Sequence, residues 1–412
     1  MASDWIHECI GAAVNPATTE YFPLVGDSDG ETVEANTEIL VRDTYTGKNL
    51  WTYVSANANN GTTTIRTRKN GANGAQSVSY AASETGSKED TVNTDAMATG
   101  ELWNYSVNTA GATGNCTFTV ISILLQHSGT GTFILAGGRS TSQAENVLNY
   151  FTPSGSGSNS ETEATRQYTL RTDGTLRNFR IYVSSNSIGA DTVARTRKNA
   201  GNGAQSVTIT ASTTGSFEDT TNSDTVTGAN ADEWNYVVNS TSAKMGTLAT
   251  RIKQVEYACI GRPHIGLSAD FPLSSDSYIG LEGGASISTV EANRQVKARV
   301  ALTVAKMFTY VSANTTTVCD VYFRQNGVNT SLTVNYGSGV TGIKEDTVNS
   351  VSIVATDLIN YFVDLTSGTS ITFQIIGSEA QQAPSNIPPG LGPSFSELLE
   401  RNFATTAVML NY

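Results

Sequence analysis

Cysteine, proline and histidine are scarce in this sequence. Its 412 residues include 4 cysteines, 9 prolines and 3 histidines, and charged residues make up only 15%. Four cysteines without a CxxC pair are too few for a disulfide scaffold. We expect buried thiols that act as small hydrophobic residues, the alternative being a disulfide or a link between subunits. These residues are Cys9, Cys116, Cys259 and Cys319.

Familiar catalytic and metal-binding patterns are also missing. No HExxH, GxSxG or P-loop motif occurs, and no two histidines have the spacing of metal ligands. Residues 27–31 (DSDGE) resemble a calcium loop, but they lack its full ligand set and do not recur. The sequence therefore predicts a non-enzymatic protein with no catalytic residue, no metal and no cofactor.

Positive charge and long apolar runs are lacking as well. The net charge is −12, whereas phosphate binding needs a surplus of lysine and arginine. We therefore expect neither nucleic acid nor a membrane surface as a partner. The longest apolar run, residues 120–125, is far shorter than the roughly 20 residues of a membrane span. Residues 1–20 have no basic stretch before a long apolar core, so we expect synthesis in a cytoplasm without a signal peptide.

The strongest positive signal is an internal repeat of about 120–130 residues. In three places an arginine is followed 21 residues later by Glu-Asp-Thr and then by an Asn-Tyr pair. The unit is large enough for a domain, so we predict domains at 1–126, 127–258 and 259–380, called repeats 1, 2 and 3. Residues 381–412 form a tail. The repeated charged residues are Arg68, Glu89, Asp90, Arg197, Glu218, Asp219, Arg324, Glu345 and Asp346.

Each repeat has the pattern of a β-sandwich. Residues 176–184, 206–210 and 234–239 alternate between apolar and polar side chains, as half-buried strands do. Asparagine–glycine pairs between such segments predict tight hairpins, at Asn70-Gly71, Asn73-Gly74 and Asn202-Gly203. The predicted fold class is all-β, with three tandem antiparallel β-sandwich domains of jelly-roll type and a short C-terminal tail.

The repeated charged residues are expected to have structural roles, because they recur in every copy. The Glu-Asp-Thr segment can accept hydrogen bonds from local backbone in a turn between strands. The repeated arginine ends a strand just before the Asn-Gly turn, and we expect it to pair with the Glu-Asp residues across the sandwich edge.

The N-terminal segment 5–11 resembles residues 255–261, since both end in Cys-Ile-Gly. Four such strands flank three domain bodies, at residues 5–10, 118–125, 252–260 and 371–376. Two hypotheses explain the surplus strand. Either each domain begins with its own first strand, or Trp5, Ile6 and Ile10 pair with the edge of a neighbouring subunit.

The C-terminal tail has the features of an assembly arm. Residues 384–393 are a proline-stiffened linker, and Ser394 with Glu397 forms a capping box that opens a short helix. An equally weighted alternative is that the tail packs back on repeat 3. Its apolar residues are Phe395, Leu398, Leu399, Val408, Leu410 and Tyr412.

The clearest motifs lie in repeat 2: LRNFRIYV at 176–183, TRKN at 196–199, and GxxEDTxN at 215–222. This order resembles the tandem jelly-roll modules of virion structural proteins in tailed phages, and the resemblance covers all three repeats. It implies a place on the virion surface, as a head decoration protein or as part of a tail or fibre. The implied partners are other virion proteins and copies of this chain.

The alternative from another class is a carbohydrate-binding or adhesive protein with a host glycan as partner. Such proteins stack sugars on exposed aromatic side chains, and Trp51, Trp103 and Trp234 are the candidates. We interpret Trp103 and Trp234 as core residues, because both precede the repeated Asn-Tyr pair and repeat 3 has Ile359 there.

Overall fold

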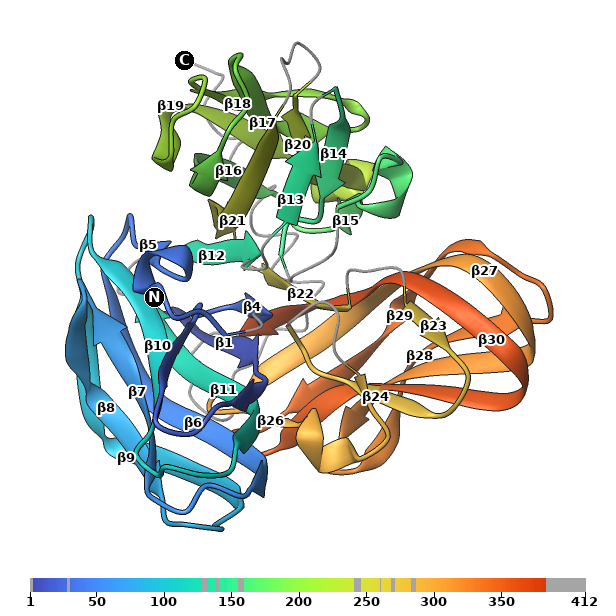
Figure 1. Cartoon of the computed structure of the whole chain (residues 1–412). Coiled ribbons are helices and arrows are strands. Elements are labelled where there is room, and N and C mark those ends of the chain that lie inside the picture. Colours follow the sequence, from blue (N-terminus) through green and yellow to red (C-terminus); the bar gives the residue numbers. More distant parts are fainter. Residues whose placement is uncertain are drawn as a thin grey trace, which may run out of the picture. The chain divides into compact units, whose positions relative to one another are not determined.

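The computed structural model consists of β-sheets whose strands pair antiparallel, apart from the short parallel pair of residues 9–10 with 26–27 (Figure 1). It describes residues 3–27, 30–127, 132–137, 141–144, 146–154, 159–240, 246–259, 261–267, 271–282 and 287–382. Within these ranges the regular elements are strands and four short 3-10 helices. None of the helices so described has the length and apolar character needed to cross a membrane. The predicted all-β class is confirmed.

The elements follow one another as three successive sets. Repeat 1 contains β1 (Ser3–Ile10), β2 (Ala13–Val14), β3 (Thr19–Phe22), β4 (Gly26–Asp27), η1 (Glu34–Asn36), β5 (Ile39–Leu40), β6 (Tyr45–Asn57), β7 (Thr63–Lys69), β8 (Ala72–Tyr80), β9 (Gly86–Met97), β10 (Leu102–Thr109) and β11 (Cys116–His127). Repeat 2 contains β12 (Thr132–Gly137), β13 (Thr141–Ala144), β14 (Leu148–Phe151), η2 (Glu163–Thr165), β15 (Tyr168–Leu170), β16 (Gly174–Asn186), β17 (Thr192–Lys198), β18 (Gly201–Ile209), β19 (Gly215–Val226), η3 (Gly228–Asn230), β20 (Asp232–Asn239) and β21 (Thr247–Cys259). Repeat 3 contains β22 (Gly261–Leu267), β23 (Phe271–Leu273), β24 (Ser277–Ile279), β25 (Ile287–Ser288), η4 (Glu291–Asn293), β26 (Val296–Lys297), β27 (Leu302–Gln325), β28 (Val328–Gly337), β29 (Gly342–Ile353) and β30 (Leu358–Gln382).

Repeats 1 and 2 share one strand order. The sheets of repeat 1 run β4-β1-β11-β6-β9 and β3-β10-β7-β8, and those of repeat 2 run β12-β21-β16-β19 and β14-β20-β17-β18. The eight main strands are β1, β3 and β6–β11 in repeat 1, and β12, β14 and β16–β21 in repeat 2. When these strands are numbered 1 to 8 along the chain, one sheet of each repeat has the order 1-8-3-6 and the other has the order 2-7-4-5. This is the order of a jelly roll. Residues Ala2–Gln382 form one compact unit, and the division into three separately folding domains stays a prediction.

Repeat 3 has the same order but joins its two sheets. Strand β27 pairs with β29 through its first half and with β28 through its second half. Strand β30 runs beside β27 along both halves, as the orange and red ribbons of Figure 1 show. The result is a single nine-stranded sheet that serves as both layers.

The first strand of each repeat pairs with the last strand of the same repeat. This holds for β1 with β11, β12 with β21, and β22 with β30. The hypothesis that each domain begins with its own strand is therefore confirmed. Pairing of residues 5–10 with a neighbouring subunit stays a prediction, since β11 occupies one edge of β1 and β4 pairs with only its last two residues on the other.

The residue before the repeated Asn-Tyr pair belongs to the core in every repeat. Trp103, Trp234 and Ile359 are each 0% exposed. Trp234 makes an edge-to-face contact with Tyr236, with 4.7 Å between ring centroids. The interpretation of these positions as core is confirmed, and it explains why an isoleucine can take the place of a tryptophan.

One of the three predicted hairpins is confirmed, and the other two are wrong, since Asn73 and Gly74 lie inside β8. Asn70 and Gly71 connect β7 to β8 with φ of 49° and 76°, as a two-residue type I′ turn requires. Asn202 and Gly203 instead lie inside β18, beside an irregularity in its pairing with β17. A Cβ at Gly203 would come within 2.2 Å of Thr196 Oγ1, so this glycine permits a close approach and not a turn.

Repeat 2 has alanine where the other two repeats have the turn glycine. Ala200 has a φ of 59°, a left-handed conformation that costs an alanine roughly 1–2 kcal/mol. We expect Ala200→Gly to raise the free energy of unfolding by about 0.5–1 kcal/mol, since the relief of strain exceeds the added chain entropy. The matched change Gly71→Ala should lower it by a similar amount. Urea unfolding measures both, and a destabilised A200G variant would contradict the argument.

Candidate functional site

The repeated aspartate holds an irregular turn within the strand. Asp219 Oδ2 accepts a hydrogen bond from the Ser206 N–H at 2.9 Å, and its Oδ1 accepts from the N–H groups of Thr221 and Asn222. Burial alone would raise the pKa of Asp219, but these bonds and that of the Asn222 amide lower it to about 2. Asp90 and Asp346 accept the equivalent bonds.

The repeated arginine does not pair with the Glu-Asp turn, which corrects the expectation from sequence. In each repeat it contacts the glutamate that begins a 3-10 helix, with Nε to Oε1 distances of 2.8, 2.8 and 2.7 Å. That glutamate lies near the arginine because of strand pairing. The short strand that follows the 3-10 helix pairs with the same long strand that also pairs with the strand of the arginine, as β5 and β7 both pair with β10 in repeat 1. The pairs are Arg68 with Glu34, Arg197 with Glu163, and Arg324 with Glu291.

The repeated glutamate instead contacts an arginine of another repeat, and the three contacts run in a cycle. The arginine of repeat 1 contacts the glutamate of repeat 2, that of repeat 2 contacts the glutamate of repeat 3, and that of repeat 3 contacts the glutamate of repeat 1. The pairs are Arg42 with Glu218, Arg171 with Glu345, and Arg299 with Glu89. We call this set the arginine–glutamate ring and its contacts the 1–2, 2–3 and 3–1 junctions.

Sequence reasoning missed the arginines of this ring. Each arginine directly follows a buried apolar residue and lies shortly before the first long strand of its repeat (β6, β16 or β27). The pairs are Val41-Arg42, Leu170-Arg171 and Ala298-Arg299. Their recurrence in all three repeats was a usable signal. Their glutamate partners could not be found in this way, because the pairing joins residues about 170–210 positions apart along the chain.

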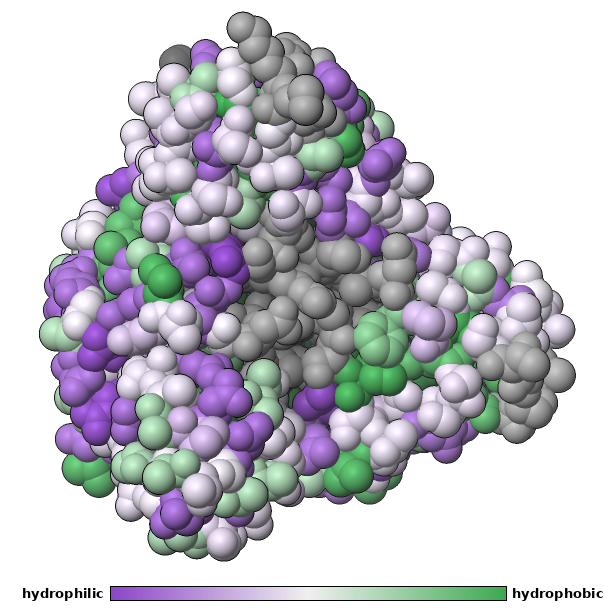
Figure 2. Space-filling view, viewed as in Figure 1, coloured by the Kyte–Doolittle hydropathy of each residue, from purple (hydrophilic) through white to green (hydrophobic). Residues whose placement is uncertain are grey.

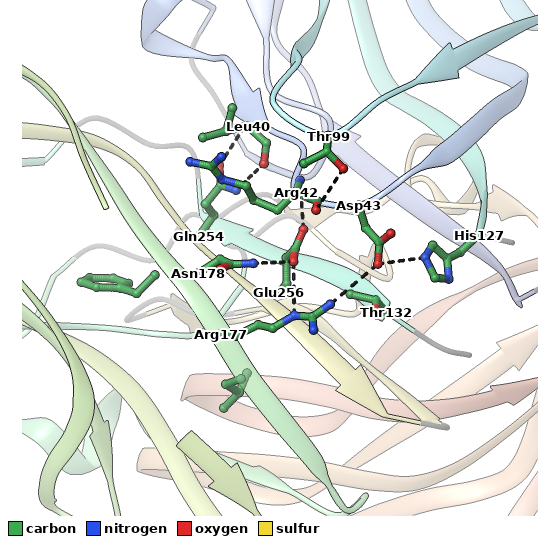
Figure 3. A network of polar contacts seen from close by, with 12 residues as sticks. Leu40, Arg42, Asp43, Thr99, His127, Thr132, Arg177, Asn178, Gln254 and Glu256 are labelled. Carbon is green, nitrogen blue, oxygen red and sulfur yellow. Dashed lines mark hydrogen bonds and ion pairs between the residues drawn. The ribbon is translucent and has the colours of Figure 1, made fainter. Parts of the chain in front are cut away.

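A buried carboxylate strengthens the 1–2 junction (Figure 3). Glu256 on β21 is 0% exposed, and its Oε1 accepts a hydrogen bond from the Arg42 N–H at 3.0 Å. Its Oε2 accepts from the Asn178 amide at 2.8 Å and lies 3.5 Å from Arg177 Nε. Burial raises the pKa of Glu256, and these donors partly oppose the rise.

A side chain of repeat 2 also forms hydrogen bonds with the backbone of repeat 1 at the 1–2 junction. The Gln254 amide bridges both polar groups of the Leu40 backbone, accepting at 3.0 Å and donating at 2.7 Å. Asp43 lies 2.9 Å from His127 Nε2 and 3.7 Å from Arg177, as Figure 3 shows. The 1–2 junction therefore uses directional hydrogen bonds as well as charge.

The 2–3 junction repeats this design. Glu379 on β30 accepts from the Arg171 N–H at 2.5 Å and from Thr172 Oγ1 at 2.7 Å, and Lys306 lies 3.3 Å away. Arg166 donates to the Gln374 amide oxygen at 2.7 Å. Both junctions thus bury one glutamate from the last strand of the following repeat.

The 3–1 junction differs from the other two. At the strand position of Glu256 and Glu379, repeat 1 has Leu124, which pairs with β6 at the matching place beside the irregularity. Lys297 lies 3.7 Å from Glu89, in addition to the ring contact. Trp51 and Leu124 belong to one apolar cluster with residues of repeat 3. This junction is therefore more apolar at the ring contact.

The predicted assembly residues lie in two places. Ile6 is buried, at 3% exposure, within the cluster that joins the repeats. The backbone of Trp5 and Ile10 lies in β1, paired inside the chain. The residues Phe395, Leu398, Leu399, Val408, Leu410 and Tyr412 fall outside the described part of the chain, so their role stays a prediction.

The candidate sugar-stacking residues are buried. Trp51 is 5% exposed, and Trp103 and Trp234 are 0% exposed. A recess of about 340 Å³ at the 3–1 junction is lined by Trp51, Tyr53 and Lys297 among others. All four cysteines are buried thiols. Across the described ranges, no group of three or more His, Cys, Asp or Glu side chains is placed to hold a metal ion.

No protein-family model matches the chain, and no curated protein is similar to it in sequence. The geometry of its own residues is thus the basis for a function. That geometry is a set of interlocked surfaces between repeats, held by ion pairs and buried hydrogen-bonded carboxylates.

Reversing one charge of the ring tests whether it holds the repeats together. Arg171→Glu would place two carboxylates together at the 2–3 junction, and we expect a loss of about 2–3 kcal/mol in the free energy of unfolding. The double variant R171E/E345R restores opposite charges and should recover at least half of the loss. Chemical unfolding measures each variant. Additive losses in the double variant would show that the two residues do not interact.

Proposed function

We propose that this chain is a non-enzymatic structural protein of a virion surface, most simply a capsid decoration protein. A component of a tail or fibre is the other form of the same proposal. The observation that carries it is the arginine–glutamate ring, which gives a single chain three similar units in cyclic order. A virion offers sites of threefold or quasi-threefold symmetry on which such a chain fits.

The resemblance of the repeats to jelly-roll modules of tailed-phage virion proteins supports the same proposal. The ring favours a compact element on a symmetric site over three units strung along a fibre axis. The partners are then other virion proteins and copies of this chain. The tail at 381–412, with its proline-stiffened linker and apolar end, is proposed as the arm that contacts them.

The surface of repeat 3 supports a contact role that the repeats do not share equally. On the face in Figure 2, hydrophobic residues form small patches among hydrophilic ones. Of the ten exposed large hydrophobic residues in the described ranges, seven belong to repeat 3. They are Val290, Val318, Val328, Val340, Ile343, Val348 and Val354. Exposed apolar side chains favour association with another protein where they form a contiguous patch.

Adhesion to glycans is the weaker candidate, since the three tryptophans proposed for sugar stacking are buried. A glycan array distinguishes the two functions. Binding of the full chain to one class of glycan would favour the adhesive function, which would then have to use other residues.

The direct test is the location of the chain on virus particles. Antibodies to the purified chain should give immunogold labelling on the outer surface of particles produced by the genome that encodes it. Label on the shell supports decoration, and label on the tail supports the tail or fibre form. A chain that stays entirely in the cell fraction, with particles unlabelled, would overturn the proposal.

The role of the tail is tested by removing residues 384–412. Light scattering and negative-stain imaging compare the truncated chain with the full one. We expect the full chain to form ordered oligomers and the truncated chain to stay monomeric. Equal association of both forms would show that the tail is not the arm.

A further inference from the structure

A fully buried polar cluster lies where repeat 1 meets repeat 3. It combines His7 and Glu8 of β1 with Arg262 and His264 of β22 and with Glu282, which follows β24. All five are at most 2% exposed. Ionisable groups are rarely buried in such number unless they are paired or have a function.

Hydrogen bonds and ion-pair contacts connect the five residues across the two repeats. Arg262 Nη2 forms an ion pair with Glu282 and also contacts His7 Nδ1 at 3.1 Å, and Arg262 Nη1 donates to the backbone oxygen of Ile6. Glu8 Oε2 accepts from the N–H groups of Leu281 and Glu282 at 2.9 and 3.2 Å. The cluster therefore fastens β1 to repeat 3.

Repeat 2 shows that the fold does not need these charges. Pairing with the last strand of each repeat makes His7, Leu135 and His264 equivalent positions. Arg262 is equivalent to Phe133, and Glu8 to Ala136, by the same registers. The repeat 2 residues are buried and apolar, with exposures of 0%. The polar cluster is thus a property of one junction.

That junction is the one that closes the ring. Repeats 1 and 2, and repeats 2 and 3, follow each other directly along the chain, whereas repeats 3 and 1 are not consecutive. The 3–1 junction is also the one with Leu124 in place of a buried glutamate. Ring closure therefore depends on the cluster more than the other junctions depend on any similar group.

The contact between Arg262 and His7 exists only while the imidazole is neutral. An arginine guanidinium can only donate, so His7 Nδ1 must accept with its lone pair. Protonation of His7 removes that lone pair and puts a second buried cation 3.1 Å from the first. Burial, Arg262 and His264 accordingly lower the pKa of His7 well below its ordinary value of 6.5.

The neighbouring groups do not offset this charge. Burial raises the pKa of Glu8 to about 8, so this carboxyl stays neutral at and below neutral pH. Glu282 already pairs with Arg262, and His264 Nδ1 lies 3.3 Å from the same carboxylate. Within the described ranges, the other titratable or charged groups that interact with the cluster are Arg294, Tyr45, Tyr105 and Tyr361.

We propose that the His7–Arg262 contact is an acid-sensitive latch that holds repeat 3 against repeat 1 and releases when His7 is protonated. The stabilising contribution is fully present above about pH 6.5 and is lost as the pH falls, because the unfolded chain then binds a proton that the folded chain excludes. The latch is a property of the closed ring and does not depend on a virion function.

The distance between repeats 1 and 3 is the direct readout. Val92 and Val348 are 86% and 90% exposed, and the native cysteines are buried, so V92C and V348C can carry a fluorophore pair on the full chain. Lowering the pH from about 7.5 to about 4.5 should reduce energy transfer while far-UV circular dichroism keeps its strand signal. Substitution of His7→Asn supplies a neutral acceptor near the place of Nδ1. It should move the midpoint at least about 0.5 pH unit lower.

The remaining histidine of the chain provides the matched control. His127 lies 2.9 Å from Asp43 at the 1–2 junction and has no contact with His7 in the pairing of β1 with β11, so H127N tests a histidine outside the latch and should leave the midpoint of the transition unchanged. Should H7N fail to fold, H7Q provides the same type of acceptor one carbon further out. Constant energy transfer down to about pH 4.5 would overturn the latch, and so would identical midpoints in the wild type and the folded His7 variant.

Discussion

The contact between an arginine of one repeat and a glutamate of the next is the interaction on which the arrangement depends. Glu218 directly precedes Asp219, whose carboxylate holds the irregular turn of β19 through backbone N–H groups. The local turn therefore also fixes the direction in which the glutamate points. Because the same pair of residues recurs in each repeat, one local rule of folding produces three equivalent contacts.

The ring order is specified by the groups buried around those contacts. Glu256 and Glu379 are desolvated, and Oε1 of each accepts its hydrogen bond from the arginine backbone N–H of the preceding repeat. A buried carboxylate without its donors is strongly unfavourable. A misplaced neighbouring repeat would therefore cost more free energy than the correct contact contributes. Leu124 removes this requirement at the 3–1 junction. There, the buried contacts of Arg262 with Glu282 and His7 are the ones that favour the correct neighbouring repeat.

The sequence was sufficient to predict the fold class, but not to predict which charged residues pair with one another. Alternating strands, the Asn70-Gly71 turn and the burial of Trp103 and Trp234 follow from local chemistry, and all were predicted. The partner of Arg68 was predicted wrongly, because a 21-residue spacing says which residues recur and not which come together in space. The likeness of residues 5–11 to 255–261 misled in the same way. Pairing shows that β1 is the counterpart of β12 and β22.

A covalent chain changes what the last junction has to supply. In a trimer of separate chains each junction must overcome the entropy of association, whereas tethered repeats meet at a high effective concentration. The closing contact can therefore be weak and still form. That freedom explains how the 3–1 junction tolerates five buried ionisable groups, an arrangement that apolar residues would stabilise better, as they do in repeat 2. A closing contact of small net free energy is also the one that a single proton can reverse.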